Sequence, residues 1–416
     1  MLRTTVGGLE LPCCIYNASG PRTGSTEALA KIAASQSGAV VSKSATLKEQ
    51  SGNPLPRFIN QIDLGPGLCD GSINSEGLPN YGIDYYLSAA ASAPALAAGK
   101  PYIASLSGLS LADNLVMLDK ALRAPNVTAI ELNLACPNIP GKPTIAYDFE
   151  QLSEVLSAVC KHKLIKTKPL GVKLAPYLDL ALIEKAVSII SAHKAIRYVV
   201  AINTIGNALF VDAEAECASF AAKGGFGGLG GGFVKQTALA NVRMLCAKFA
   251  EVGRTDIDIV GVGGVSSGRD AFEMILCGAR AVQVGTAHWV EGAGVFARIA
   301  GELEGMMRSK GYRSIDDFCG KLKPFEAHKS HVPTRASRGG AGVNSAAVTM
   351  VAAALVCAGP LAIFGANHVW GGTGMSGVVY GLVPLASVLV VWLLAWAAGV
   401  KVVGLRIDDN DSKKTD

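Results

Sequence analysis

Apolar runs rich in β-branched residues alternate with amphipathic stretches of helical period from residue 11 to about residue 290. The apolar runs are PCCIYNASG, GAVVSKSA, PYIASLSG, VTAIELNLAC, PLGVKLAPY, RYVVAINTIG, DIVGVGGVS and AVQVGTAHW. The stretches between and after them predict helices at about 26–36, 83–98, 111–122, 149–162, 179–193, 237–252, 269–277 and 294–309. Eight strand-then-helix units predict an α/β fold of the (β/α)8 TIM barrel type, with a doubly wound open sheet as the alternative.

The pattern changes after the eighth unit. Residues 326–343 are polar and predict a linker after a barrel domain at 1–325. Two apolar spans follow at about 344–366 and 377–400, and each is long enough to cross a hydrocarbon core of about 30 Å. We therefore predict two transmembrane helices within 344–400 and a cytosolic tail at 401–416, with a buried helical hairpin of a soluble domain as the alternative.

Charge sets the expected orientation of this segment. The loop between the spans carries no fixed charge, whereas basic residues flank both spans on their outer sides: Lys329, Arg335, Arg338, Lys401, Arg406, Lys413 and Lys414. Both ends should then face the cytosol, which predicts a membrane-anchored protein with its barrel on the cytosolic side. The final KKTD resembles a dilysine retrieval signal for the endoplasmic reticulum.

Composition excludes several classes of protein. The net charge of +5 over 416 residues forms no long basic block, so nucleic acid is not an expected partner. Ten cysteines are scattered without CxxC or paired spacing, which favours a reducing compartment and predicts neither a disulfide framework nor a metal site.

Polar and glycine residues stand where the apolar runs end. Because the carboxyl ends of barrel strands meet on one face, we expect a site there. Lysines within apolar strands, Lys43 and Lys173, are costly unless each ammonium meets an anion or a flavin-like acceptor. The glycine pair at 263–264 and Gly285-Thr286 follow the last two strands and predict a phosphate-bearing cofactor held by backbone N–H groups, with plain tight turns as the alternative.

The stretch ELNLACPNIPGKP, residues 131–143, carries the candidate chemistry. An apolar strand runs into Asn133, Cys136 and Asn138 and then into a Pro/Gly-rich loop. A lone cysteine after a strand is usually core filler. Here the thiol lies between two amides in a loop, which indicates catalysis. With a free pKa of about 8.5, the thiol needs neighbours that stabilise its thiolate.

Two insertions interrupt the barrel pattern. Residues 47–80 contain SINSEGLPN, which can curl over a ligand or form an ordinary asparagine-rich turn. The glycine run at 224–232 predicts a mobile loop or a second backbone approach to the cofactor. The run lacks the Lys-Ser ending of a P-loop, so no nucleoside triphosphate site is expected.

With these motifs assembled, residues 3–325 closely resemble the class 1A dihydroorotate dehydrogenases, which are FMN enzymes of pyrimidine (UMP) biosynthesis. The resemblance rests on NASG, SKSAT, INSEGLPNYGIDYY, ELNLACPNIPGKP, GVKL, NTIGN, GGLGGGFVKQTALANVR, VGG and CGARAVQVGTA, which occur in this order. It implies oxidation of dihydroorotate to orotate, reduction of fumarate to succinate, and a homodimer.

The resemblance also implies roles for single residues. Cys136 would remove the C5 proton of dihydroorotate while a hydride leaves C6 for N5 of FMN, under a lid formed by the loop after Cys136. The substrate would be held by Lys43, Asn74, Gly77, Leu78, Asn133, Asn138, Asn203 and Thr204. The flavin would meet Ala18, Ser19, Lys43, Ser44, Asn133, Lys173 and Ile202, and its phosphate side Gly231, Gly263, Gly264, Gly285 and Thr286.

Three positions depart from the family pattern: Glu76 replaces methionine, Thr204 replaces serine and Gly232 replaces alanine. The Glu76 carboxylate should weaken orotate binding by like-charge repulsion unless it points to solvent or pairs with a cation. A predicted membrane anchor would suit a quinone or a membrane-bound acceptor in place of fumarate. A related FMN barrel enzyme for another pyrimidine and an anchored, non-catalytic flavin-binding scaffold are further alternatives.

Overall fold

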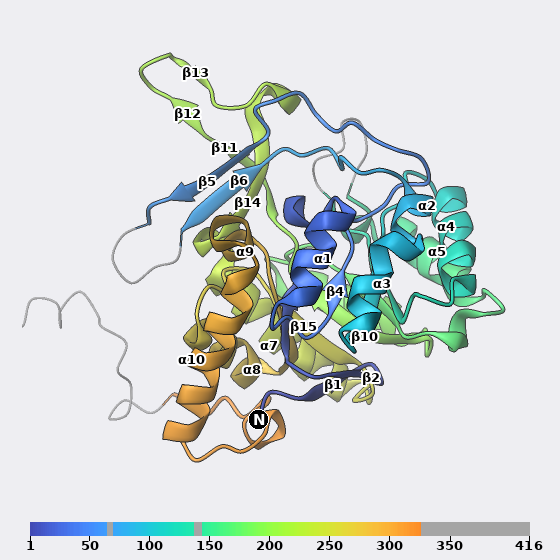
Figure 1. Cartoon of the computed structure of the whole chain (residues 1–416), viewed down its shortest axis with the longest axis vertical. Helices are drawn as coiled ribbons and strands as arrows, with labels where there is room; N and C mark the ends of the chain where they lie inside the picture. The colour runs from blue at the N-terminus through green and yellow to red at the C-terminus, as the bar shows by residue number, and fades with distance from the viewer. Residues whose placement is uncertain (65–69, 137–143, 326–416) are drawn as a thin grey trace, which may run out of the picture. The chain divides into compact units, whose positions relative to one another are not determined.

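The computed structural model describes residues 1–64, 70–136 and 144–325 (Figure 1). Eight parallel strands form one sheet in which spatial neighbours follow chain order. They are β3 (Ile15–Asn17), β4 (Val40–Val41), β7 (Tyr102–Leu106), β8 (Ala129–Asn133), β9 (Leu170–Lys173), β10 (Ile196–Ala201), β15 (Asp258–Val262) and β16 (Ala279–Val284). This order closes into a barrel and confirms the predicted fold, because a doubly wound sheet would reverse its strand order in the middle.

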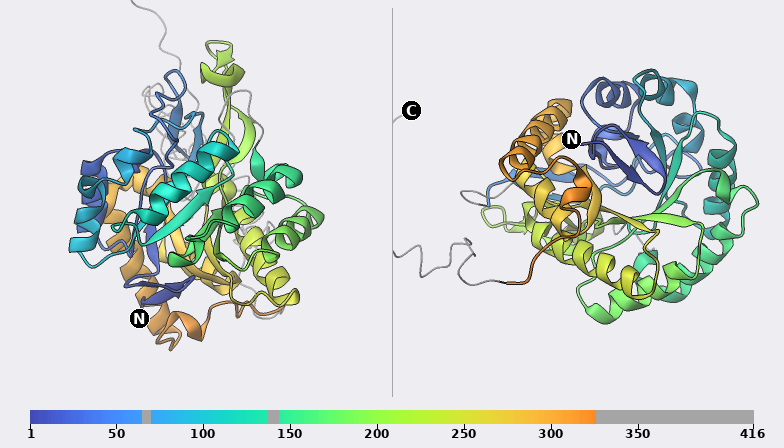
Figure 2. Two further views of the ribbon diagram at one scale, coloured as in Figure 1. Left: turned by 90° about the vertical axis from the view of Figure 1, so that its right-hand side faces the viewer. Right: turned by 90° about the horizontal axis from the view of Figure 1, so that it is seen from below.

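The predicted helices surround the strands as an outer ring (Figure 2, right). They are α1 (Thr26–Ala34), α2 (Ile83–Tyr86), α3 (Ala89–Ala97), α4 (Leu111–Arg123), α5 (Phe149–Cys160), α6 (Leu180–Ser191), α7 (Lys235–Glu251), α8 (Gly268–Cys277) and α10 (Val295–Ser309), with the short α9 (Thr286–Glu291) after β16. The single helix predicted at 83–98 is divided in two. Ser88 interrupts it, because its side chain accepts a hydrogen bond from the Ala91 N–H and begins α3 as an N-cap.

The barrel closes between its first two strands through a side chain. Asn17 on β3 accepts a hydrogen bond from the Val41 N–H on β4 at 2.9 Å and donates one to the Val41 carbonyl at 2.8 Å. A backbone bond from Gly38 to Ile15 lies beside this pair. The fully buried amide of Asn17 thus takes the place of a strand ladder at this junction.

A second, four-stranded antiparallel sheet lies at one end of the barrel, opposite the hairpin of β1 (Thr4–Val6) and β2 (Leu9–Leu11) (Figures 1 and 2). Its strands come from both insertions, in the order β11 (Ile205–Leu209), β14 (Phe226–Gly231), β6 (Gly71–Asn74) and β5 (Phe58–Ile62). Most of the glycine run at 224–232 therefore lies in a paired strand, in place of the mobile loop that was one of its two predicted forms. A small hairpin of β12 (Val211–Asp212) and β13 (Cys217–Ala218) projects from this sheet.

The linker, the two apolar spans and the tail predicted at 326–416 lie outside the described residues. Within the described ranges, no helix combines the length and the apolar character that a bilayer crossing requires. The longest of these helices, α7, has 17 residues and carries Lys235, Arg243 and Lys248. The predicted membrane-anchored, cytosol-facing location with its endoplasmic reticulum signal is therefore wrong for the chain as the structure describes it.

Candidate active site

A cavity of about 380 Å³ lies at the carboxyl ends of the barrel strands, beneath β6 and β14 of the small sheet. All but three of the residues predicted for the site line it. These are Ala18, Ser19, Lys43, Ser44, Asn74, Leu78, Asn133, Lys173, Ile202, Asn203, Thr204, Gly231, Gly263, Gly264, Gly285 and Thr286. Parallel strands bring these distant sequence positions together on one face.

The other three predicted residues differ in position. Cys136 is partly buried and lines a neighbouring cavity of about 140 Å³, which it shares with Asn133. Gly77 does not line the main cavity, and a side chain there would meet Asn53 at 2.5 Å. Asn138 and the predicted lid at 137–143 lie outside the described residues.

Hydroxyl groups connect the first four strands at the floor of the cavity. The Ser44 hydroxyl lies 3.0 Å from that of Ser19 and 2.9 Å from that of Ser105, and it accepts a hydrogen bond from the Asn133 amide at 3.0 Å. Sequence reasoning missed Ser105, although its place inside an apolar strand was the available signal. The hydrogen bond to Ser44 fixes the orientation of the Asn133 side-chain amide and therefore the direction of its Oδ1.

The side-chain oxygen of Asn133, Oδ1, in turn accepts hydrogen bonds from the Asn203 side-chain amide at 3.3 Å and from the Ala135 N–H at 3.1 Å. Asn203 also donates to the Ala135 carbonyl at 2.8 Å and accepts from the Thr204 N–H at 2.9 Å. These bonds hold the chain directly before Cys136. The backbone that leads to Cys136 is therefore fixed, as a thiol predicted to act as a base would need.

Two ammonium groups converge on the same cavity. Lys43 and Lys173 are 6% and 3% exposed, and burial lowers the pKa of each. The negative charges of Glu76 and Cys136 oppose this shift at Lys43, while Glu131 and Cys136 oppose it at Lys173. A Cys136 thiolate thus has two cations nearby that stabilise it. The cavity is suited to an anionic ligand.

The turn after β15 forms a cradle. Gly263 and Gly264 have φ values of 126° and 70°, a region that side chains rarely adopt, and a Cβ on Gly264 would lie 2.5 Å from that of Lys235. Asp270 fixes the following turn by accepting from the Ser266 N–H at 2.9 Å, and it pairs with Lys235. This backbone fits a phosphate group that approaches closely.

The opposite wall of the cradle comes from Thr286, whose hydroxyl lies 2.9 Å from that of Ser72 on β6. Gly230 and Gly231 of β14 also line the cavity beside it. Backbone and hydroxyl groups from the barrel and from the small sheet therefore face one space. A phosphate-bearing cofactor would contact both sheets.

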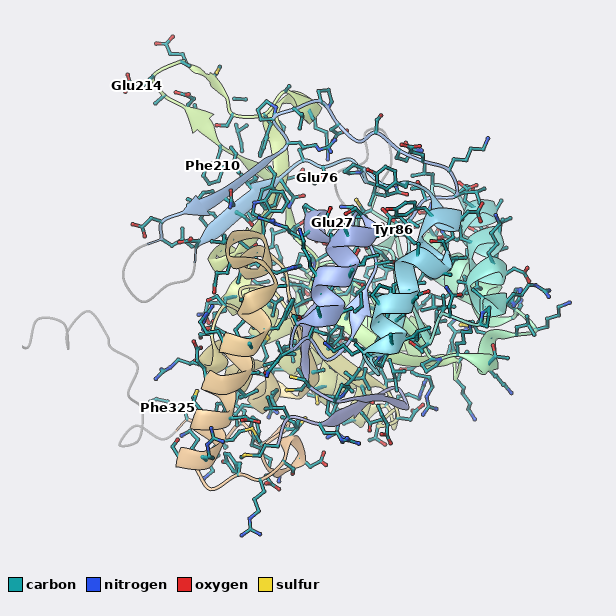
Figure 3. The ribbon with its side chains drawn as sticks, in the orientation of Figure 1. Glu27, Glu76, Tyr86, Phe210, Glu214 and Phe325 are labelled. Atoms are coloured by element: carbon teal, nitrogen blue, oxygen red, sulfur yellow. The ribbon has the colours of Figure 1, made fainter. Side chains whose placement is uncertain are left out.

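Glu76 pairs with a cation. Its carboxylate lies 3.4 Å from Nε of Arg57, and the side chains are 12% and 23% exposed. Arg57 also donates to the carbonyls of Ser51 and Asn53 at 2.8 and 3.2 Å. Glu76, labelled in Figure 3, follows β6 and lines the cavity. Sequence reasoning missed Arg57, since no motif connects the two positions.

The dihydroorotate dehydrogenase family model matches residues 1–307. Dihydroorotate dehydrogenase A (fumarate) of Lactococcus lactis is 46% identical over 325 residues, which cover 78% of this chain and 99% of that protein. Dihydroorotate dehydrogenase (fumarate) of Saccharomyces cerevisiae is 46% identical over 307 residues, covering 74% and 93%. A solved structure of the Eimeria tenella enzyme with ferulenol has the same fold at 18% identity, with a TM-score of 0.60 over 78% of this chain and 89% of that one. The chain belongs to the dihydroorotate dehydrogenase family.

Proposed function

We propose that residues 1–325 form an FMN-dependent dihydroorotate dehydrogenase of the fumarate type, acting in pyrimidine biosynthesis. It would oxidise (S)-dihydroorotate to orotate and reduce fumarate to succinate. The observation that carries this proposal is the placement of Lys43 and Lys173 in an amide-lined cavity, with Cys136 in the neighbouring cavity that Asn133 also lines. The names of the fumarate-type relatives, matched over nearly their full lengths, support the choice of substrate and acceptor.

The residues of the cavity fit FMN. Gly263, Gly264 and Thr286 form a cradle for its phosphate, and Ser44, Asn133 and Lys173 line the floor where its ring would lie. FMN, when bound, accepts a hydride from the substrate and delivers it to the acceptor. The protein's share is to position both reactants and to move one proton.

Cys136 would be the group that moves the proton. As a thiolate it takes the proton from C5 of dihydroorotate while C6 loses a hydride, so the ring loses two hydrogens and gains a C5–C6 double bond. The positive charges of Lys43 and Lys173 stabilise the thiolate before the proton is transferred. The hydrogen bond from Asn203 to the Ala135 carbonyl holds the backbone next to Cys136 in place. Proton return from the thiol completes the cycle during reduction of fumarate.

The substrate would be held by one cation and several amides. Dihydroorotate carries a carboxylate and two imide-like carbonyls, which suit Lys43 and the amides of Asn74, Asn133 and Asn203 around the cavity. Asn74 lies on β6, where its amide donates to the Gly228 carbonyl of β14 at 3.3 Å. The small sheet would thereby form one side of the substrate site.

A homodimer is part of the proposal. The projecting sheet exposes large apolar side chains, with Leu209, Val211 and Phe226 at 45%, 62% and 42%. Glu214 marks the far tip of this projection in Figure 3. Apolar groups gathered on a projecting element favour contact with a second copy of the chain. Equilibrium sedimentation of the wild-type protein and of Val211→Asp tests this contact.

The deciding experiment is anaerobic reduction of the purified protein's flavin by dihydroorotate, followed by addition of fumarate or of a short-chain quinone. We expect bleaching that fumarate reverses. Bleaching that only quinone reverses would overturn the acceptor, and bleaching by dihydrouracil in place of dihydroorotate would overturn the substrate. Protein that binds FMN and is bleached by neither compound would contradict the enzymatic role itself.

A further inference from the structure

A carboxylate is buried inside the barrel, below the proposed cofactor site. Glu131 on β8 is fully buried, and its Oε2 accepts a hydrogen bond from Nε2 of Gln283 on β16 at 2.7 Å. β8 and β16 are four strands apart in either direction around the ring of eight. This bond therefore crosses the barrel interior, and the Glu131 side chain points into it.

The residue beside Glu131 on the neighbouring strand is a glycine, and the ring of Tyr198 fills the space that a side chain there would occupy. Glu131 pairs in register with Gly171 on β9, and a Cβ on Gly171 would lie 2.1 Å from the ring of Tyr198. The Tyr198 hydroxyl donates to the Ile130 carbonyl at 2.8 Å. Two tyrosines and an amide thus surround the carboxylate. Burial, and then the charge of Glu131, raise the pKa of both Tyr16 and Tyr198, so these phenols stay neutral.

One oxygen of the carboxylate is not hydrogen-bonded. Among the described residues, neither Oε1 of Glu131 nor Oε1 of Gln283 has a hydrogen-bond partner. A buried carboxylate in that condition is destabilising unless a cation compensates its charge. The cross-barrel hydrogen bond alone does not account for an ionised acid at this position, since a neutral amide would make the same bond.

Lys173 is placed to supply the compensating charge. It lies two residues beyond Gly171 on β9 and pairs in register with Asn133. Side chains alternate along a strand, so Glu131 and Lys173 share the inner face as diagonal neighbours. No direct ion pair joins these two described residues, but the charge of Glu131 acts on the Lys173 ammonium through the buried interior. Lys173 is itself 3% exposed and lines the cofactor cavity.

We propose that Glu131 is a positioning residue, whose buried charge keeps the Lys173 ammonium protonated and directed at the cofactor site. This inference rests on the proposed function for the identity of the cofactor but not for the charge interaction between Glu131 and Lys173. The charged and titratable groups that face Glu131 and Lys173 are Tyr16, Tyr198, Cys136 and Lys43. Without Glu131, the burial of Lys173 would favour its neutral form, and the cofactor would lose a cation.

A double-mutant cycle in the full chain tests the pair without any assay of activity. Urea unfolding is measured for the wild type, Glu131→Gln, Lys173→Met and the double variant, with and without saturating FMN. Lys173→Met leaves the carboxylate uncompensated, so we expect a large loss of stability that the added Glu131→Gln reverses by at least tenfold in the unfolding constant. Lys173→Met with Gln283→Met is the matched control, which removes the hydrogen bond to Glu131, keeps its charge and should give no rescue.

Each outcome of this double-mutant cycle supports or overturns the proposed interaction between Glu131 and Lys173. Rescue by Glu131→Gln, including the case in which Lys173→Met alone does not fold, supports the pair. Additive effects, or equal rescue by Gln283→Met, overturn it. Should neither protein with Lys173→Met fold, FMN binding to Glu131→Gln decides: we expect about tenfold weaker binding that falls further as the pH rises above neutral, whereas binding like that of the wild type contradicts the inference. A protein that binds FMN but does not oxidise dihydroorotate would refute the proposed function. The unfolding and FMN-binding measurements would still test the interaction between Glu131 and Lys173.

Discussion

Neutralising Glu76 should strengthen the binding of orotate. The residue lines the cavity beside Lys43 and pairs with Arg57 at 3.4 Å, so an anionic ligand meets two opposite charges that nearly cancel. Glu76→Gln keeps the shape of the side chain and removes the negative charge. The cation of Arg57 then acts on the ligand without its counter-charge. We expect a lower dissociation constant for orotate and a lower KM for dihydroorotate.

The size of this effect follows from the cavity. A sphere with the cavity's volume of about 380 Å³ is about 9 Å across, and unit charges at that separation interact by about 2 kcal/mol at an effective dielectric constant of about 20. This energy corresponds to a dissociation constant about 30-fold lower. Arg57→Gln should raise the constant by a similar factor, and the double variant should return it to near the wild-type value.

The assay is titration of the oxidised holoenzyme with orotate, followed by the change in flavin absorbance at two salt concentrations. Glu49→Gln is the control, because Glu49 is a carboxylate that does not line the cavity of about 380 Å³, and we expect less than a twofold change from it. Weaker or unchanged binding of orotate by Glu76→Gln would refute the reasoning. A double variant that binds no better than Arg57→Gln would also refute it.

Three further predictions concern other parts of the site. Cys136→Ala should slow flavin reduction by dihydroorotate about 10²- to 10⁴-fold in stopped flow, since a general base is lost, and a rate within threefold of Cys217→Ala would contradict this role. Asp270→Asn should weaken FMN binding and cost about 2 kcal/mol in urea unfolding, because Lys235 keeps Glu273 but loses its charged hydrogen bond to Asp270. An effect no larger than that of Asp119→Asn, at a partly exposed carboxylate, would count against it. Burial, and then Arg22, lower the pKa of His288 from 6.5 to about 4. The unfolded state therefore binds the extra proton between these values, and stability should fall by about 3 kcal/mol from pH 6.5 to 4, whereas in His288→Phe this part of the pH dependence should be absent.

The barrel could be predicted from sequence because each of its units is local. An apolar run, a turn and an amphipathic helix follow one another within about thirty residues, and parallel closure then brings the strand ends together. Lys43, Asn133 and Lys173 could be assigned to the site for the same reason, since each stands at the end of a run. Their convergence needed only the topology.

The remaining features depend on pairs that are distant in sequence and carry no periodic signal. β14 pairs with β6 across more than 150 residues, and its glycines have little intrinsic preference for a strand. Gln283 meets Glu131 across 152 positions, and Arg57 meets Glu76 without any motif. In each case, tertiary packing decides the contact, and one sequence without its fold does not reveal it.

The junction between β3 and β4 differs from the other junctions of the barrel, because the Asn17 side chain closes it. Seven of the barrel's junctions are backbone ladders, whereas the eighth depends on one amide and a neighbouring backbone bond. Ser19 follows β3 on one side of this junction and Lys43 follows β4 on the other, and both residues line the cavity. A cofactor bound in this cavity would contact both sides of the junction and stabilise it. A substitution at Asn17, a residue outside the cavity lining, should therefore weaken cofactor binding as well as the stability of the barrel.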